Sequence, residues 1–295
     1  MVDNIRASTA TGKPQESFGR LVEYLGRTGG VLVAFSGGVD SSLVLAAATQ
    51  ALGARVLAVT ACSPTYPDHE KDQAAAIAQR LGARHGFIDS DELQDPSYRA
   101  NPPNRCYYCK RELFQKLQEI ATRQDLPVIV DGSNADDELD FRPGRKAAKE
   151  FGVRSPLAEL GFGKNLIRQM AKAQGLPNWD QPACACLASR IPYGQEITPL
   201  RLRRVAQAEA ALRDYGFRTV RVRDHGTLAR IEIPRAEIDR TLRDGNYQRL
   251  IDACKQQGYV YVCLDLEGYR TGSMNEVLDS SEKGKSLLSE SEAGQ

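Results

Sequence analysis

The chain has 295 residues, a formal net charge of +1 and 41% hydrophobic residues, which fits a globular protein of about two domains. The near-zero net charge excludes an overall basic field that would favour binding of nucleic acid. The sequence contains no run of about 18 apolar residues, so no membrane span is predicted. The N-terminus also lacks the apolar region of a secretion signal, so we expect a cytoplasmic protein with reduced cysteines and without a membrane or nucleic-acid partner.

The first part of the chain alternates strand and helix patterns. Residues 1–17 are polar and predict a flexible N-terminus, followed by a short amphipathic helix over 17–27. Short apolar runs predict buried strands at 31–35, 55–60, 83–88 and 127–131. Helical patterns lie between them at 43–52, 68–81 and 110–123. This alternation predicts an α/β domain over 18–180, with a parallel sheet, helices on both faces, and ligands beyond the carboxyl ends of the strands.

The pattern changes after residue 180. Helices are predicted at 198–215, 235–243 and 247–257, and strands at 219–223, 228–233 and 259–266. This order predicts a smaller α+β domain over 181–275, of ferredoxin-like type, that serves substrate binding and oligomerisation. The last segment, 276–295, is rich in Ser, Glu and Lys and is predicted to be disordered.

A glycine-rich loop follows the first predicted strand and leads into a helix, with the sequence Ser-Gly-Gly-Val-Asp-Ser-Ser at 36–42. Gly37 and Gly38 let backbone amides approach an anion, and the helix adds unpaired N–H groups at its N-terminus. Asp40 beside phosphate oxygens favours an intervening Mg²⁺. The loop lacks the Lys of a Walker sequence. The alternative is an ordinary strand-to-helix turn with an Asp cap.

This loop resembles the PP-loop of the ATP pyrophosphatases, whose sheet is of the adenine nucleotide alpha-hydrolase-like type. The resemblance implies cleavage of ATP between its α- and β-phosphates and an adenylate intermediate. It implies ATP contacts from residues of the loop and of later strand ends, namely Ala34, Ser36, Gly37, Gly38, Asp40, Ser41, Ser42, Thr60, Ser63 and Gly132.

Four of the seven cysteines form two close pairs, Cys106 with Cys109 just before a predicted helix, and Cys184 with Cys186. Clustered cysteines in a reducing compartment indicate metal or sulfur chemistry. Their spacing leaves open a four-cysteine zinc site, a redox pair, and a three-cysteine iron–sulfur cluster with an open iron. The other cysteines lie in strand or helix patterns and are expected to be structural: Cys62, Cys254 and Cys263.

Three further segments are similar to the LarE family, over about residues 19–275: Cys-Leu-Ala-Ser-Arg-Ile-Pro-Tyr-Gly at 186–194, Asp-Phe-Arg-Pro-Gly at 140–144 and Val-Arg-Val-Arg at 220–223. LarE proteins are ATP-dependent sulfur transferases that make the nickel-pincer nucleotide cofactor of lactate racemase. The resemblance implies pyridinium-3,5-biscarboxylic acid mononucleotide as the substrate, whose carboxylates become thiocarboxylates.

The family has two sources of sulfur. In one, a cysteine gives up its own sulfur; in the other, three cysteines hold a [4Fe-4S] cluster whose open iron carries sulfide. The CxxC pair resembles the cluster type, which implies Cys106, Cys109 and Cys186 as ligands, with Cys184 as the alternative third ligand. The resemblance also implies a sulfide donor and a homo-oligomer.

The substrate carries a phosphate and two carboxylates, groups that guanidinium binds in a bidentate manner. Arg221 and Arg223 alternate on one predicted strand face and can converge with Arg190 on an anion, although a solvated charged face is the alternative. The resemblance implies that Ser189 donates to phosphate. It also implies that Glu209 lies near Mg²⁺ and phosphate. The alternative is that Glu209 is an acidic residue on the surface of a helix.

The expected chemistry begins with attack of a substrate carboxylate on the α-phosphorus of ATP, after which a sulfur nucleophile displaces AMP. Mg²⁺ at Asp40 and nearby cations would stabilise the phosphate charge. The predicted catalytic residues are Asp40, Cys186, Ser189 and Arg190.

Three rival functions fit parts of the sequence. A PP-loop tRNA thiolase is disfavoured by the near-neutral charge. An amide-forming ATP pyrophosphatase would need no cysteines. A non-catalytic iron–sulfur or zinc protein that senses nucleotide would release no pyrophosphate in response to a pyridinium dicarboxylate.

Overall fold

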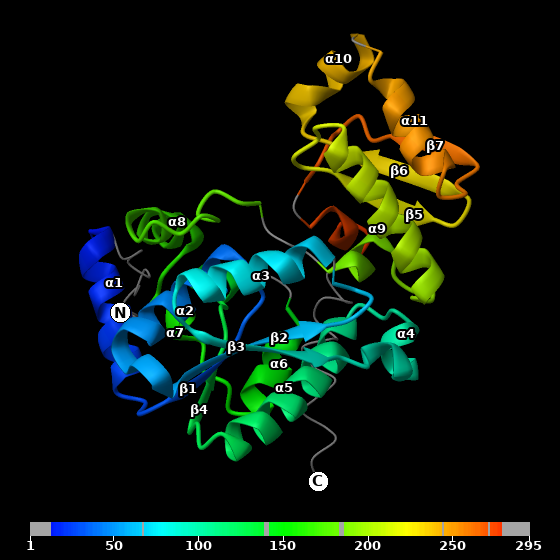
Figure 1. Ribbon diagram of the computed structural model, residues 1–295. Helices are drawn as coiled ribbons and strands as arrows, with labels where there is room; N and C mark the ends of the chain where they lie inside the picture. Colours follow the sequence, from blue (N-terminus) through cyan, green and yellow to red (C-terminus); the bar gives the residue numbers. More distant parts are fainter. Residues whose placement is uncertain are drawn as a thin grey trace, which may run out of the picture. The chain divides into compact units, whose positions relative to one another are not determined.

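The computed structural model describes residues 13–66, 68–138, 142–182, 186–243, 245–270 and 272–278 (Figure 1). The chain divides into two compact units. The first unit consists of residues 1–62, 68–90 and 107–183, and the second consists of 63–67, 91–106 and 184–295. In the part of the chain that the structure describes, no helix is long and apolar enough to cross a membrane.

The first unit contains a parallel sheet with the strand order β3-β2-β1-β4. Its strands are β1 (Val31–Ala34), β2 (Val56–Cys62), β3 (Arg84–Asp89) and β4 (Val128–Val130). Val33 of β1 lies opposite Ala58 of β2 on one side and Val130 of β4 on the other. The predicted parallel sheet is therefore confirmed.

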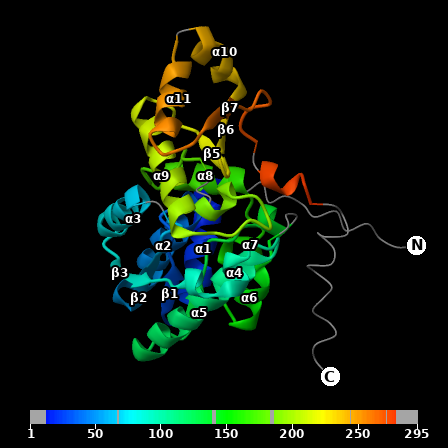
Figure 2. The same cartoon turned by 90° about the vertical axis from the view of Figure 1, so that its right-hand side faces the viewer.

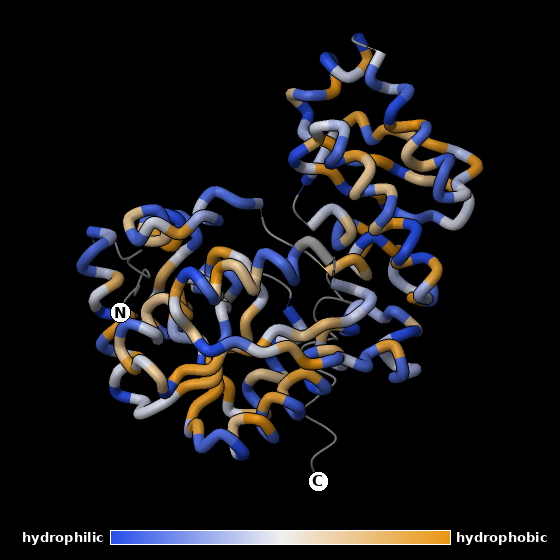
Figure 3. Tube along the Cα trace, in the orientation of Figure 1, coloured by the Kyte–Doolittle hydropathy of each residue, from blue (hydrophilic) through white to orange (hydrophobic). Residues whose placement is uncertain are grey.

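Helices cover both faces of this sheet because its central strands are apolar on both sides (Figures 1 and 3). Val31 and Val33 pack in the same core cluster as Leu43 of α2, whereas Leu32 packs with Phe114 in α5. The helices that lie wholly within this unit are α1 (Pro14–Gly26), α2 (Val39–Leu52), α3 (Asp68–Arg80), α6 (Gly144–Glu150), α7 (Pro156–Glu159) and α8 (Lys164–Ala173). Helix α5 (Arg105–Arg123) covers the face opposite α2 with its residues from Tyr107 onward.

The second unit contains a mixed sheet of β5 (Arg221–His225), β6 (Leu228–Glu232) and β7 (Tyr261–Leu264), in that order. Strands β5 and β6 are antiparallel, whereas β6 and β7 are parallel. Figures 1 and 2 both show helices beside this sheet, which are α9 (Pro199–Asp214), α10 (Arg235–Arg243) and α11 (Tyr247–Lys255). The α+β prediction holds, but a ferredoxin-like arrangement is wrong, since β7 pairs in parallel with β6 at the edge of a three-stranded sheet.

Several predicted helix starts were too late. Helix α1 begins at Pro14, because proline suits the first helical position, so residues 14–17 are not frayed. Helix α5 begins at Arg105, so Cys106 and Cys109 lie inside the helix and not before it. Residues 1–12 of the predicted flexible N-terminus, and 279–295 of the predicted disordered tail, lie outside the described residues.

Candidate functional site

The PP-loop of the first unit joins the end of β1 to the start of α2. Gly37 has a φ of 71°, a conformation that favours glycine, and Gly38 precedes the first turn of the helix. The Ser36 and Ser41 hydroxyl oxygens lie 3.1 Å apart, and Ser41 Oγ donates to the Gly38 carbonyl at 3.1 Å. Hydroxyls and the amide groups of a helix N-terminus therefore meet in one loop, which is the environment that phosphate prefers.

The segment after β4 packs directly on this loop. A Cβ atom placed on Gly132 would lie 2.7 Å from the Ser41 backbone nitrogen, so the position accepts only glycine without a shift of the backbone. The Asp131 carboxylate fixes the turn by accepting from Ser133 N and from Ser155 Oγ, at 3.1 and 2.8 Å. The structure thus brings together the two glycine-containing segments for which ATP contacts were predicted.

Asp40 lies in the first turn of α2 with its two carboxylate oxygens in different situations. Its Oδ2 atom is 2.5 Å from Lys164 Nζ, whereas Oδ1 is buried and has no hydrogen-bond partner among the described residues. Burial raises the pKa of Asp40, and Lys164 opposes part of that increase. A buried carboxylate oxygen without a partner, beside hydroxyls at a helix N-terminus, fits a Mg²⁺ ligand.

Lys164 was not found by the sequence analysis. It is the first residue of α8, where its backbone N–H donates to Asp136 Oδ2 at 2.7 Å. This hydrogen bond fixes the start of the helix, so the ammonium group reaches Asp40. A single lysine at the start of a helix has no periodic or spacing signal that would mark it.

The remaining predicted ATP contacts are placed differently. Ser42 is fully buried and accepts a hydrogen bond from Asn178, so it holds the loop in place. Thr60, in β2, is also buried, and its Oγ1 lies 2.9 Å from His85 Nε2. Burial lowers the pKa of His85. Ser63 belongs to the second unit, where its Oγ lies 2.7 Å from Thr65 Oγ1; direct contact of ATP with Ala34, Ser42, Thr60 and Ser63 stays a prediction.

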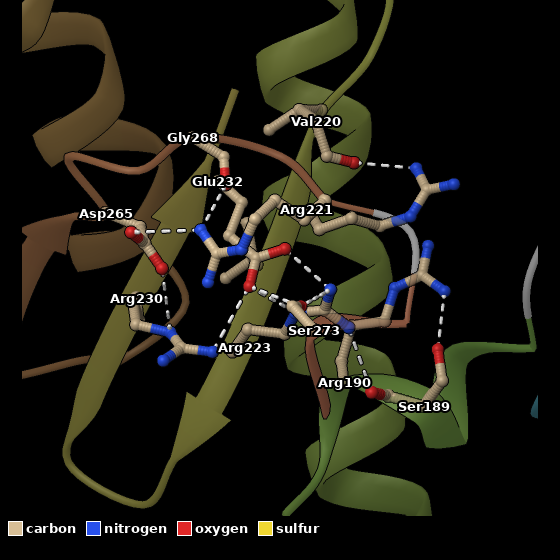
Figure 4. A network of polar contacts seen from close by, with 12 residues as sticks. Ser189, Arg190, Val220, Arg221, Arg223, Arg230, Glu232, Asp265, Gly268 and Ser273 are labelled. Atoms are coloured by element: carbon tan, nitrogen blue, oxygen red, sulfur yellow. Dashed lines mark hydrogen bonds and ion pairs between the residues drawn. The ribbon is translucent and has the colours of Figure 1, made fainter. Parts of the chain in front are cut away.

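In the second unit, an arginine cluster consists of Arg190, Arg221 and Arg223 with Glu209 and Glu232. Figure 4 shows the three arginines and Glu232. Arg190 donates to both oxygens of Glu209, at 2.8 and 2.9 Å. Arg223 donates to both oxygens of Glu232, at 2.9 and 2.5 Å. All five side chains are buried, and bidentate geometry makes such pairs specific.

Arg221 is the third arginine of the cluster. It precedes Arg223 by two residues on β5, and its Nη1 donates to the Val220 carbonyl at 2.9 Å. Its guanidinium carbon lies 5.3 Å from the centre of the Tyr269 ring. Burial, and then the charge of Arg190, lower the pKa of Arg221. A bound phosphate or carboxylate would relieve this concentration of positive charge.

Ser189 and Glu209 connect this cluster. The Ser189 hydroxyl accepts from Arg190 Nη1, and its carbonyl accepts from Arg223 Nη1, both at 3.0 Å. Glu209 also accepts from the Val222 backbone N–H at 3.0 Å. Burial alone would raise the pKa of Glu209, but Arg190 and the other donors lower it overall. Both Glu209 oxygens have protein partners, and its role as a Mg²⁺ ligand stays a prediction.

The predicted cysteine ligands are divided between the two units. Cys106 belongs to the second unit, as does Cys186, whereas Cys109 belongs to the first. Cys186 is an exposed residue, but desolvation of its thiol raises its pKa, while a side-chain hydrogen bond with Thr65 acts in the opposite direction. Cys184 lies outside the described residues. Within the described ranges, no group of three or more His, Cys, Asp or Glu residues could hold a metal ion.

Arg105 is a second residue that the sequence analysis missed. Only 6% of it is exposed, and its Nη1 has no hydrogen-bond partner in the described part of the chain. Its guanidinium carbon lies 4.7 Å from the centre of the Tyr193 ring. Burial tends to lower the pKa of Arg105, but Cys106, Tyr193 and Cys186 raise it overall. A buried cation is therefore close to two of the predicted cysteine ligands.

Comparison with known proteins gave one family model, for NAD synthase, which matches residues 16–101. An uncharacterised protein of Synechocystis sp. is 46% identical over 88% of this chain and 96% of its own length. The pyridinium-3,5-bisthiocarboxylic acid mononucleotide synthase of Lactiplantibacillus plantarum is 42% identical over 84% of this chain and 90% of the synthase. An uncharacterised protein of Methanocaldococcus jannaschii is 31% identical over 82% of this chain and 91% of its own length.

Proposed function

This chain belongs to the LarE family of PP-loop enzymes, and we propose that it uses ATP to insert sulfur into pyridinium-3,5-biscarboxylic acid mononucleotide. The observation that carries the proposal is the 42% identity to the L. plantarum synthase over 90% of that protein. A similarity of this length is not confined to the nucleotide-binding loop, so it favours a common substrate as well as a common use of ATP.

The first proposed step is adenylation of a substrate carboxylate. A carboxylate oxygen attacks the α-phosphorus of ATP, the bond from that phosphorus to the oxygen bridging to the β-phosphate breaks, and pyrophosphate leaves with the electron pair. The PP-loop amides, the Ser41 hydroxyl and Lys164 would stabilise the charge on the phosphates. Mg²⁺ held by Asp40 would neutralise further phosphate charge.

In the second step, a sulfur anion attacks the acyl carbon, the bond between that carbon and the AMP oxygen breaks, and AMP leaves. For the sulfur source we propose a [4Fe-4S] cluster held by Cys106, Cys109 and Cys186, with Cys184 as the alternative third ligand. Among the residues that the structure describes, no group of three or more His, Cys, Asp or Glu could hold a metal ion, and no step of this mechanism depends on the cluster. A sacrificial Cys186 and a zinc site are the competing outcomes.

For substrate binding we propose the arginine cluster. The buried guanidinium group of Arg221, on the same strand as Arg223, supports binding of a phosphate or carboxylate there. Ser189 and Arg190 lie in the same hydrogen-bonded network and would orient the anion. Glu209 accepts hydrogen bonds from Nε and Nη2 of Arg190 and so fixes its guanidinium group. The proposal also includes a Mg²⁺ ion at Glu209.

The proposal places the reaction in the cytoplasm, where ATP is available and thiols remain reduced. It also includes a homo-oligomer and a donor that resupplies sulfide. Both rest on the family resemblance.

The proposed reaction is tested with protein purified without oxygen. The protein is incubated with ATP, Mg²⁺ and the pyridinium dicarboxylate mononucleotide, and pyrophosphate and product mass are measured. We expect substrate-dependent pyrophosphate release and a mass shift for exchange of oxygen by sulfur. Product that contains nitrogen from added ammonia would favour the amide-forming alternative, and salt-sensitive binding of tRNA would favour the thiolase. Absence of pyrophosphate release would contradict both steps.

The sulfur source is tested by iron, acid-labile sulfide and the visible spectrum. The variants are Cys106→Ala, Cys109→Ala, Cys184→Ala and Cys186→Ala, and the matched control is Cys263→Ala, an exposed thiol in β7. Loss of the cluster in three variants, with retention in the fourth and in the control, would support the proposal and identify the ligands. Absence of iron and sulfide in the wild-type protein would overturn the cluster, and a lower protein mass after turnover would identify a sacrificial cysteine.

A further inference from the structure

Asn178 reaches the PP-loop from the segment after α8. Its Nδ2 donates to the Gly37 carbonyl oxygen at 2.8 Å and to Ser42 Oγ at 2.9 Å. Only 1% of the residue is exposed. A carbonyl oxygen can only accept, so the nitrogen of the Asn178 amide must face Gly37. Both Nδ2 hydrogens are used, whereas Oδ1 has no hydrogen-bond partner among the described residues.

The Gly37 carbonyl has a second donor. Gln73 Nε2, in α3, lies 3.3 Å from it. Gln73 and Gln181 exchange hydrogen bonds between their amide groups, at 2.5 and 3.1 Å. Two amide donors from different segments therefore hold one carbonyl of the loop. Glycine at positive φ has several accessible conformations, so an external partner is needed to select one of them.

Fixing this carbonyl also fixes the N–H of the next residue. The Gly37 carbonyl and the Gly38 N–H belong to one planar trans peptide and point in opposite directions. The Gly38 N–H faces Ser36 Oγ at 3.4 Å, and Ser36 Oγ lies 3.1 Å from Ser41 Oγ. The N–H is thus turned towards the hydroxyls of the loop and away from Asn178.

Asn178 also connects the loop to the helix. Ser42, its second acceptor, donates its backbone N–H to the Gly38 carbonyl at 2.9 Å, within the first turn of α2. One buried amide therefore sets the orientation of the glycine peptide relative to the helix N-terminus, the two sources of N–H groups for a phosphate.

We propose that Asn178 is a positioning residue of the ATP site, which acts through the Gly37 carbonyl to aim the Gly38 N–H at the polyphosphate and does not itself contact ATP. The inference rests on the proposed use of ATP. It assigns a role in phosphate binding to a residue outside the PP-loop sequence.

The test compares Asn178→Asp and Asn178→Ala with wild-type protein and with Asn165→Asp, a matched change on the exposed face of α8. Affinities for ATP and for adenosine, which lacks phosphates, are measured by calorimetry. Aspartate has nearly the same shape but places an oxygen against the Gly37 carbonyl. We expect Asn178→Asp to weaken ATP binding by about 10- to 100-fold, the range that follows from a lost buried hydrogen bond. Adenosine affinity should not change, and Asn165→Asp should bind both ligands normally.

In turnover, Asn178→Ala should raise KM for ATP more than it lowers kcat. Unchanged ATP affinity in the Asn178 variants would overturn the inference, as would parallel losses for ATP and adenosine, which indicate general disruption of the fold. If Asn178→Asp does not fold, Gln73→Glu presents an oxygen to the same carbonyl from a partly exposed position, and a selective but smaller loss of ATP affinity is expected. Unchanged ATP affinity in Gln73→Glu would then overturn the inference. A wild-type protein that binds adenosine but no ATP would overturn the proposed function and the inference together.

Discussion

The PP-loop and the arginine cluster are both suited to anions, but they are built in different ways. The PP-loop offers backbone N–H groups in a continuous stretch, where Gly37 has a positive φ. Gly132 lets the separate segment after β4 approach this loop closely. The arginine cluster offers side chains that come from a turn, a helix and two strands. A site formed by backbone groups consists of consecutive residues, whereas a site formed by side chains depends on how distant segments pack.

The two regions also differ in how their charges are compensated. Asp40 keeps one buried oxygen without a partner among the described residues, so this carboxylate is incomplete without a ligand. Glu232 accepts from Arg223, Arg230 and Ser273, and is fully buried. We infer that Asp40 serves binding at a cost in stability, whereas Glu232 serves stability. The following predictions test this contrast.

The largest expected effect is on the stability of the second unit. Glu232→Gln removes the charge that compensates the buried Arg223, and loss of one partner of a buried ion pair costs about 3–5 kcal/mol. The free energy of unfolding, measured in urea, should fall by that amount. Glu23→Gln, which breaks an exposed pair on α1, is the control and should change little. A loss no larger than that of the control would show that the cluster does not stabilise the unit.

Asp40→Asn should reduce activity without reducing stability. Substrate-dependent pyrophosphate release should fall by about 10²- to 10³-fold, as is typical when a preorganised electrostatic group is removed. Stability should be unchanged or higher, because the substitution removes a buried charge with an unsatisfied oxygen. Asp72→Asn, on the exposed face of α3, should change neither quantity. Normal pyrophosphate release in Asp40→Asn would exclude a role for this carboxylate in catalysis.

Gly132→Ala tests the close approach of the two loops. The added Cβ would lie 2.7 Å from Ser41 N, so the backbone must shift, and such overpacking costs about 1–3 kcal/mol. ATP affinity should weaken by about tenfold or more, measured by calorimetry. The control is Gly19→Ala, at an exposed position of α1 with open space around it, which should stabilise the helix by about 0.5–1 kcal/mol. Equal ATP affinity in both variants would mean that the loop after β4 is not part of the site.

The smallest expected effect concerns a partly exposed ion pair, Arg154 with Glu159. A hydrogen bond from Arg154 lowers the pKa of Glu159 from 4.5 to about 2. The folded state therefore favours the ionised form of Glu159 more than the unfolded state does. The resulting contribution to the free energy of unfolding is fully present above about pH 4.5 and is lost as the pH falls towards 2. Glu159→Gln should cost at most about 1 kcal/mol at pH 7 and should flatten the pH dependence of unfolding between those values. An unchanged pH dependence would contradict the lowered pKa.

Local signals in the sequence predicted the structure correctly. The glycine loop at 36–42, the parallel sheet and the α+β character of the second unit all follow from periodicity and from consecutive residues. The predicted start of α5 was wrong, because the helix begins at Arg105 and not at residue 110. The three-cysteine grouping was inferred from sequence pattern and family resemblance, and it stays a prediction.

The sequence by itself determined which segments can bind phosphate, because glycines and hydroxyls act within a few bonds of the backbone that carries them. Only the tertiary structure decided how that loop is held and completed. Asn178 and Lys164 lie more than a hundred residues after the loop, and packing of the segments around α8 brings their side chains to Gly37 and Asp40. Long-range hydrogen bonds and ion pairs of this kind depend on the packing of the whole unit, and a single side chain carries no periodicity from which they could be read.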